Sequence, residues 1–599
     1  MIVTTGPQLN GTWLTWKSFW YPDSQGPVWA YSVPNSVANQ LNSAYSLMLD
    51  ILTGQFWILV ISTAIFLILR RKKVTHAVFK DMMPSLWNKN SDLFGAVTET
   101  TINMVTKNDN VQPSVRLWLT VLVVLALYAG QKALSILVAP KIILANAAPV
   151  DPTAIYIPSN AETGNSIVAA RFVLNVPWAL RALGTATAAI ATLSAFVNVS
   201  QETVIGTWNG LGGPEDIKQV TYSYRVTGAD MGLQRYPDLA LTVNGSCFTE
   251  YSWYQGSGSL DDSPCINGDL YYWFGDPNDT FFASELAGPA PAATFVAGVP
   301  NLRGALPSSN ATWAAIVSAV GKYSFTEGTD PWYRTETRST NASTDIGAPY
   351  VVAPGRPALS CWEDNVWSYR GHRADVNSLG DLPGLDLSAG MQHVLRHYLS
   401  VPMVMEMSQY LGTSALVSGS SAIGAVIDAG ANRFSTDLER LVVAAYVATT
   451  NVLTATTLYP YGASALVPND VQSASGQVID GVADFVVWTP EVAALNLVVV
   501  ITIPVLLVAI YLCGVILLSA TSLGKAKALG AVDLYFSLIN AHPSAAIEFK
   551  PWNSAEWNLH HENEVPVPKP SPKAANAAEQ KRIPDEPLVV NSESSMGKS

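Results

Sequence analysis

The stretch from Ile51 to Leu69 constrains this chain more than any other. It holds 19 residues without a charge, close to the roughly 20 that an α-helix needs to cross a bilayer core of about 30 Å. The basic residues from Arg70 to Lys73 follow it directly. Because basic residues beside a span tend to stay in the cytosol, the sequence predicts a transmembrane helix at residues 51–69 with its N-terminal end outside.

The overall composition favours a membrane protein. Charged residues make up 13% of the chain and hydrophobic residues 49%, whereas about a quarter of a soluble globular protein is charged. The net charge is −12, and domains that bind nucleic acid need a basic surface to neutralise phosphates. We therefore expect membrane lipid among the partners of this protein and no nucleic acid.

Two further apolar stretches predict a second span at residues 117–138 and a third at residues 495–518. The basic loop at residues 70–116 carries eight Lys and Arg, whereas Lys17 is the only basic residue before the first span. This asymmetry predicts that the loop is cytosolic. Lys132 lies inside the second span, where it either extends toward the interface or pairs with a polar group on another helix.

The remaining segments follow from this topology. Residues 1–50 form an extracytosolic segment rich in aromatic residues, which suit a membrane interface or packing against another folded part. Residues 139–494 form one large extracytosolic domain with 31 Asp and Glu against 16 Lys and Arg. Residues 519–599 are cytosolic, and their Pro-, Lys- and Ser-rich composition predicts a largely disordered tail.

The large domain has three compositional zones. Residues 160–200 have a helical pattern interrupted at Pro177, residues 201–370 alternate like strands and turns, and the pattern becomes helical again to about Leu458. Ser435 is a candidate N-cap in the last zone. Leu183–Val197 and Leu441–Leu458 are uncharged but weakly apolar, so we expect both to remain outside the membrane. The predicted fold class is a membrane protein with three transmembrane α-helices and a large extracytosolic α+β domain.

The four cysteines suggest one disulfide. Cys247 and Cys265 are near in sequence and would pair in an oxidising compartment, with Cys361 as a rival partner for either of them. Three reduced, buried thiols are the other alternative. Cys513 lies inside the third predicted span.

Six Asn-x-Ser/Thr sequons fall in the segments predicted to lie outside, which adds modest support for passage through the secretory pathway. They are at Asn10, Asn198, Asn244, Asn278, Asn310 and Asn341.

Residues with catalytic or metal-binding chemistry are sparse. His393 and His397 are spaced i, i+4 and share a face of a helix, so they are weak candidates for a metal site. A polar helix face is favoured instead, because the sequence between them lacks the Glu of the metalloprotease motif. Neither a nucleophile elbow nor a phosphate-binding loop is recognisable. We predict no catalytic residues and no cofactor.

Two segments carry a family resemblance: YSYRVTGADMGLQRYPDLALTVNGSCFTEYSW from Tyr222, and LSCWEDNVWSYRGHRADVNSLGDLPGL from Leu359. With Ser360-Cys361-Trp362 and Trp367-Ser368-Tyr369, the chain resembles a group of uncharacterised integral membrane proteins of filamentous fungi, over residues 45–530. The resemblance implies no activity. It implies that Cys361 and Trp362 are structural and anchor a buried core.

These observations predict a multi-pass glycoprotein of the plasma membrane, with the N-terminus outside and the C-terminus cytosolic. The expected role is that of a surface receptor-like, adhesive or wall-associated binding protein, with a cell-wall polysaccharide or another surface protein as its partner. The alternatives are a membrane-tethered enzyme acting on carbohydrate, which we favour less, and an accessory subunit of a larger membrane complex.

Overall fold

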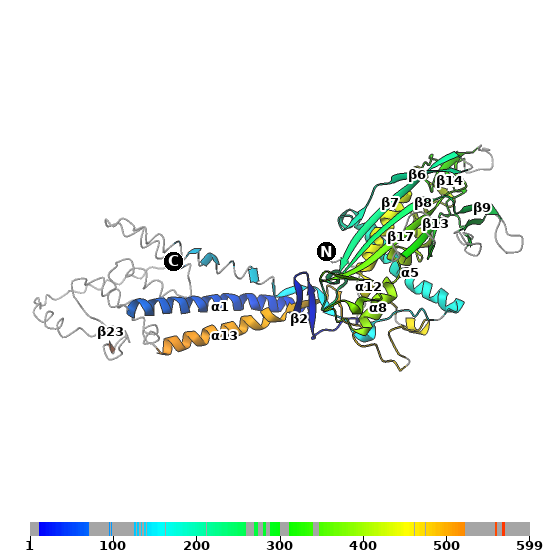
Figure 1. Ribbon diagram of the computed structural model, residues 1–599. Helices are drawn as coiled ribbons and strands as arrows, with labels where there is room; N and C mark the ends of the chain where they lie inside the picture. Colours follow the sequence, from blue (N-terminus) through cyan, green and yellow to red (C-terminus); the bar gives the residue numbers. More distant parts are fainter. Residues whose placement is uncertain are drawn as a thin grey trace, which may run out of the picture. The chain divides into compact units, whose positions relative to one another are not determined.

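The computed structural model describes most of the chain (Figure 1). The described residues are 11–70, 141–161, 163–210, 213–258, 269–273, 280–282, 288–299, 311–338, 347–460, 462–473, 475–520, 557–559 and 566–568, with single helical positions between 95 and 138. The chain forms two compact units. The first contains Met1–Ala38 and Leu144–Asn496, and the second contains Asn39–Ile143 and Leu497–Ser599.

An eight-stranded sheet is the centre of the first unit, and every pairing within it is antiparallel. Along its longest strand, Gly213–Thr227, buried and more exposed residues alternate, because neighbouring side chains of a strand point to opposite faces. The central strand Ala240–Glu250 is instead buried along most of its length. In spatial order the strands are β12 (Ala293–Ala297), β13 (Ala311–Val317), β17 (Ala358–Tyr369), β8 (Ala240–Glu250), β7 (Gly213–Thr227) and β5 (Val197–Val199), with β6 (Thr203–Gly210) paired to β7 and β18 (His372–Ala374) paired to β17.

Helices cover one face of this sheet and share its hydrophobic core. At the centre of the helical layer, α11 (Phe434–Thr450) packs on α5 (Asn165–Ala188) and on β7, and all but four of its residues are buried. The other helices are α6 (Ile190–Leu193), α7 (Gly228–Met231), α8 (Ala389–Leu399), α9 (Met403–Ser408), α10 (Val417–Ser421) and α12 (Val452–Ala455). The predicted strand-rich centre between two helical zones is therefore present.

Two local predictions in the helical zones are wrong. Helix α5 continues through Pro177 without interruption, since burial of its Trp178 and Ala182 face in the core offsets the lost backbone hydrogen bond. Helix α11 begins at Phe434 and is not capped by Ser435, whose hydroxyl donates to Glu202 instead.

A second, four-stranded sheet joins distant segments of the first unit. Its order is β1 (Ser18–Asp23), β2 (Gly26–Pro34), β21 (Val492–Asn496) and β3 (Ile143–Ala145). Beside it, β4 (Ala147–Pro149) pairs with β20 (Val486–Trp488). The aromatic N-terminal segment is thus built into the folded unit, with Phe19 and Tyr21 buried against Trp488.

The remaining strands form small sheets. They are β9 (Tyr254–Gly258) with β10 (Asp269–Trp273) and β11 (Thr280–Phe282), β14 (Tyr323–Ser324) with β15 (Thr335–Thr337), β16 (Tyr350–Val352) and β19 (Val426–Ile427), and β22 (Trp557–Leu559) with β23 (Pro566–Pro568).

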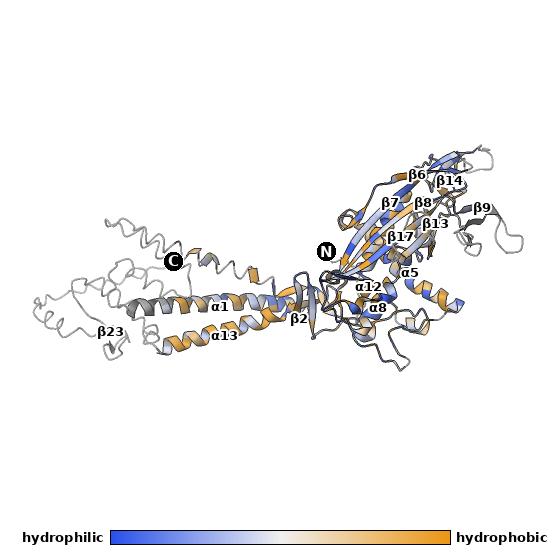
Figure 2. Cartoon of the chain, viewed as in Figure 1, coloured by the Kyte–Doolittle hydropathy of each residue, from blue (hydrophilic) through white to orange (hydrophobic). Residues whose placement is uncertain are grey.

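Two long apolar helices belong largely to the second unit. Helix α1 (Asn35–Arg70) begins sixteen residues before the predicted first span, and α13 (Leu497–Ala520) matches the predicted third span closely. The Tyr45 hydroxyl donates to the Val500 carbonyl at 2.8 Å, which links the two helices. Helix α13 is apolar along its length (Figure 2). Most of its side chains are exposed or half-buried, as expected of a helix that meets lipid.

Among the described residues, three helices are long and apolar enough to cross a membrane: Asn35–Val60, Asn165–Ala188 and Leu497–Leu517. The second of these is α5, whose inner face lies in the core of the first unit, so we assign it to the folded domain. Most of the predicted second span at residues 117–138 lies outside the described residues.

The four-stranded sheet constrains the topology of the chain. Strand β2 leads directly into α1, and β21 leads directly into α13, with the Asn35 amide donating to the Glu491 carbonyl at 2.8 Å. Strands that share hydrogen bonds cannot be separated by a bilayer. The paired strands β1, β2, β21 and β3 therefore lie on one side of any membrane that these helices cross.

Candidate functional site

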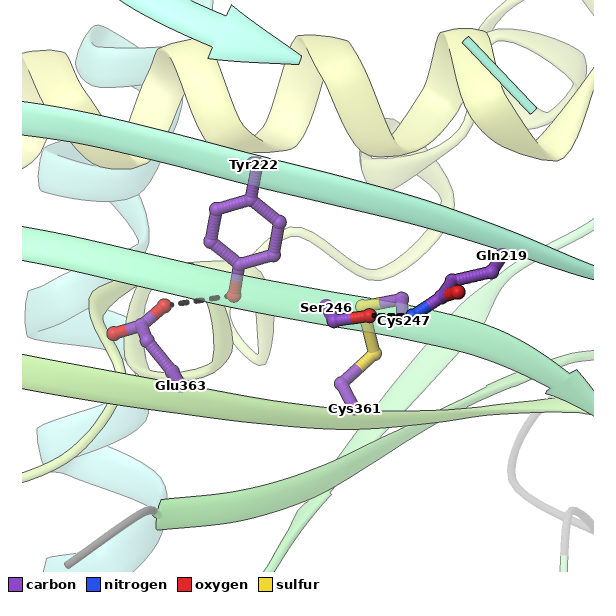
Figure 3. The surroundings of a disulfide bond; sticks show 6 residues. All are labelled: Gln219, Tyr222, Ser246, Cys247, Cys361 and Glu363. Carbon is purple, nitrogen blue, oxygen red and sulfur yellow. Dashed lines mark hydrogen bonds between the residues drawn. A yellow bond between two sulfur atoms is a disulfide. The ribbon is translucent and has the colours of Figure 1, made fainter. Parts of the chain in front are cut away.

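The disulfide lies in the middle of the large sheet. Cys247 on β8 faces Cys361 on β17, and their sulfur atoms are bonded, with the Cα atoms 4.1 Å apart (Figure 3). The predicted pairing of Cys247 with Cys265 is therefore wrong, and the alternative pairing of Cys247 with Cys361 is correct. The register of two adjacent strands brings together cysteines separated by 114 residues, whereas Cys265 lies outside the described residues.

A buried carboxyl group lies beside this disulfide. The Tyr222 hydroxyl on β7 donates to Glu363 on β17 at 2.8 Å, across the intervening strand β8 (Figure 3). Gly245 makes this contact possible, because a Cβ at that position would lie 2.1 Å from the Tyr222 ring. Burial raises the pKa of Glu363 to about 7, although the hydrogen bond from Tyr222 partly opposes the rise.

Trp362 and Trp367, the two tryptophans of the segments that carry the family resemblance, have different surroundings. Cys361 is buried in the core as expected, but Trp362 points to the opposite face of the sheet and is only half-buried. The tryptophan that anchors the core is Trp367, which is fully buried.

The two candidate metal-ligating histidines do meet a third polar group. His393 Nε2 lies 2.7 Å from Oδ2 of Asp470, and His397 Nδ1 lies 3.4 Å from the same oxygen. The helix α8 therefore presents both imidazoles on one face, as predicted. The sequence did not indicate Asp470, because it lies 73 residues after His397 in a loop without a recognisable motif.

The contacts of Asp470 explain what this cluster does in the fold. Its other oxygen accepts a hydrogen bond from Ser159 at 3.3 Å, and its backbone amide donates to Ile157 at 2.8 Å. The contacts with His397 and His393 lower the pKa of Asp470 to about 2. Among the described residues, no group of three or more His, Cys, Asp or Glu is arranged to hold a metal ion. The cluster joins α8 to two loops and leaves the His393 side chain 41% exposed.

Buried carboxyl groups also organise the start of α11. Asp330 accepts hydrogen bonds from the Phe434 and Trp332 amides at 3.1 and 2.9 Å, so a residue about 100 positions away takes the capping role predicted for Ser435. Asp437 accepts from the Val417 amide and the Tyr333 hydroxyl at 2.7 and 2.8 Å. Burial raises the pKa of both acids to about 6.

A depression of about 450 Å³ lies on the large sheet near its β5 edge. Its lining includes Phe196, Arg225 and Thr242, together with Asn198 and Asn244, the two described sequon asparagines. Both asparagines are exposed. The other predicted glycosylation sites, Asn10, Asn278, Asn310 and Asn341, lie outside the described residues.

Comparison with known proteins adds a family without an assigned activity. The family model described as a domain of unknown function (DUF8406) matches residues 176–487, which include the large sheet and most of the helical layer over it. No curated protein and no solved structure matches the chain. Because the match covers more than half of the sequence, the chain belongs to the family of this domain of unknown function.

Proposed function

We propose that this protein is a plasma-membrane glycoprotein of the type found in filamentous fungi, which presents residues 11–34 and 141–496 outside the cell as one binding domain. The role that we propose is receptor-like, adhesive or wall-associated, with a cell-wall polysaccharide or another surface protein as the partner. The observation that carries the proposal is the direct continuation of two strands of one sheet into two apolar helices, α1 and α13. Such connections anchor a folded domain without a flexible linker.

The disulfide supports the outward orientation. The bond between Cys247 and Cys361 is buried in the sheet, and structural disulfides persist mainly in oxidising compartments. The basic residues from Arg70, the last residue of α1, to Lys73 favour the cytosol for the C-terminal end of that helix. The acidic excess of the domain also favours solubility over adsorption to anionic lipid.

The orientation is tested by mapping modified residues in the full-length protein. We expect a Cys247–Cys361 linked peptide without reduction, and glycan on Asn244 that is removed by endoglycosidase. Surface biotinylation of intact cells should label the domain, while a C-terminal tag should become reachable only after permeabilisation. Unmodified Asn244, unchanged mobility and a surface-accessible tag would together overturn the orientation.

The binding role is tested with the full chain in lipid nanodiscs. We expect retention on at least one insoluble wall polysaccharide, chosen from β-glucan, chitin and mannan, above the retention of empty nanodiscs. Cross-linking on intact cells tests the other partner class, because a surface protein should be captured reproducibly by the domain. Absence of both results would contradict the binding role.

One observation favours an enzyme as the second candidate. The contact of 2.7 Å between His393 and Asp470, with a partly exposed imidazole, is the arrangement of an oriented general base. A tethered enzyme acting on carbohydrate should release soluble sugar from the same polysaccharides, and His393→Gln should abolish the release without loss of binding. Retention on polysaccharide without any release favours the binding role.

A further inference from the structure

The two described sequon asparagines lie in one row across three strands. Asn198 on β5 faces Ser223 on β7, and Ser223 faces Asn244 on β8. Adjacent strands are about 4.8 Å apart, so the two asparagines lie about 10 Å from each other. They are separated by 46 residues in the sequence, and only the strand order makes them neighbours.

Both side chains point away from the helical layer. Val197, Tyr224 and Val243 are buried in the core shared with the helices, and neighbouring residues of a strand point to opposite faces. Asn198, Ser223 and Asn244 therefore share the other face of the sheet. The depression lies at this row, since all three residues are part of its lining.

We propose that Asn198 and Asn244 both carry N-linked glycans, and that the two glycans together cover the depression and shield this part of the sheet from partners. This inference rests on the proposed outward orientation of the domain. An N-linked glycan is bulky and well solvated, and two of them attached about 10 Å apart leave little of a depression of about 450 Å³ accessible. A partner of the domain would then have to bind elsewhere.

The folded sheet also indicates when the glycans are attached. The Ser246 hydroxyl of one sequon is buried and accepts a hydrogen bond from Gln219 Nε2 at 2.7 Å (Figure 3). The Ser200 hydroxyl of the other accepts from the Thr221 amide at 2.9 Å. Since both hydroxyls are engaged in the sheet, transfer must precede the pairing of β5 and β8 with β7.

The transfer itself needs an oligosaccharide linked to a polyprenyl diphosphate. The asparagine amide nitrogen forms a bond to the anomeric carbon of the first sugar, and the bond from that carbon to the diphosphate oxygen breaks. The amide loses one proton and the polyprenyl diphosphate leaves.

The test places a cysteine between the two glycans. In the full chain carrying Ser223→Cys, a maleimide joined to a bulky polyethylene glycol should react about tenfold more slowly before enzymatic removal of the glycans than after it. Adding Asn198→Gln and Asn244→Gln should give the fast rate without enzyme. Ser475→Cys, in an exposed loop, is the matched control, and its labelling rate should not change.

The outcomes separate this inference from the proposed function. Absence of glycan from the whole chain would overturn the orientation on which both depend. Glycan elsewhere in the chain, with Asn198 or Asn244 unmodified, would overturn the paired glycans alone. Equal labelling of Ser223→Cys with and without glycans, whether fast or slow, would overturn the shielding.

Discussion

Glu363 makes the stability of the domain depend on pH at the level of a single residue. Burial raises its folded-state pKa from 4.5 to about 7, so the folded state holds the proton more tightly than the unfolded state. The resulting stabilisation is complete below about pH 4.5 and is lost as the pH rises through about 7, on the order of 3 kcal/mol in total. Asp330 and Asp437, with pKa values raised to about 6, act in the same direction.

We therefore predict that Glu363→Gln removes part of this pH dependence. The variant should unfold at nearly the wild-type temperature at pH 5 and at a higher temperature than wild type at pH 8, because its side chain stays neutral. Thermal unfolding in detergent micelles, followed by tryptophan fluorescence, measures both. Asp364→Asn, on the same strand but on the opposite face, is the control. The prediction would be contradicted if the unfolding temperatures of wild type and Glu363→Gln changed by the same amount between pH 5 and pH 8.

At the scale of elements, the closeness of β7, β8 and β17 depends on Gly245. Its missing side chain lets the Tyr222 ring cross β8 to reach Glu363. We predict that Gly245→Ala lowers the free energy of unfolding by about 1–3 kcal/mol, because the new methyl group displaces the ring. The sequon at Asn244 remains intact in this variant, so a change in glycan occupancy does not complicate the measurement by chemical unfolding.

Gly184→Ala in α5 is the matched control for that substitution. A Cβ at position 184 meets no atom within 4 Å, and alanine is favoured over glycine inside a helix by about 0.5–1 kcal/mol. The control should therefore be neutral or stabilising. Equal changes in the free energy of unfolding for Gly245→Ala and Gly184→Ala would show that the position of the Tyr222 ring does not depend on Gly245.

At the scale of the whole molecule, the four-stranded sheet holds together segments that flank the apolar helices. Val33 on β2 faces Ala493 on β21, and facing residues of antiparallel strands lie within disulfide reach. We predict that the double variant Val33→Cys/Ala493→Cys forms a disulfide during passage through the secretory pathway. Mass spectrometry should find the linked peptides, with Cys247–Cys361 retained.

The pair Val33→Cys/Ala145→Cys is the control for this cross-link. Ala145 lies on β3, which is two strands away from β2 in the sheet. The two strands are therefore roughly 10 Å apart, which is beyond the reach of a disulfide. Linked peptides in the control alone, or in neither variant, would show that β2 and β21 do not share a sheet in the membrane-bound protein.

Much of the architecture was predictable because it depends on short stretches of sequence. The hydropathy of residues 51–69 and 495–518 identified two long apolar helices, although α1 begins earlier, where polar residues share its first turns. The short alternating and aromatic runs in residues 201–370 identified a zone of strands and turns, which holds most strands of the large sheet. The i, i+4 spacing placed His393 and His397 on one face of a helix. Each of these signals is contained within a few turns or one strand.

Only the tertiary structure decided which of these pieces meet. The partner of Cys247 was open between Cys265 and Cys361 until strand order and register placed β8 beside β17. Packing of the elements likewise placed Asp470 beside His393 and His397, and Asp330 at the start of α11. Sequence by itself determined the apolar helices and the helical and strand-rich zones, because periodicity and hydropathy are local properties. Contacts between residues about 100 positions apart depend on how the elements pack, and no local pattern encodes that packing.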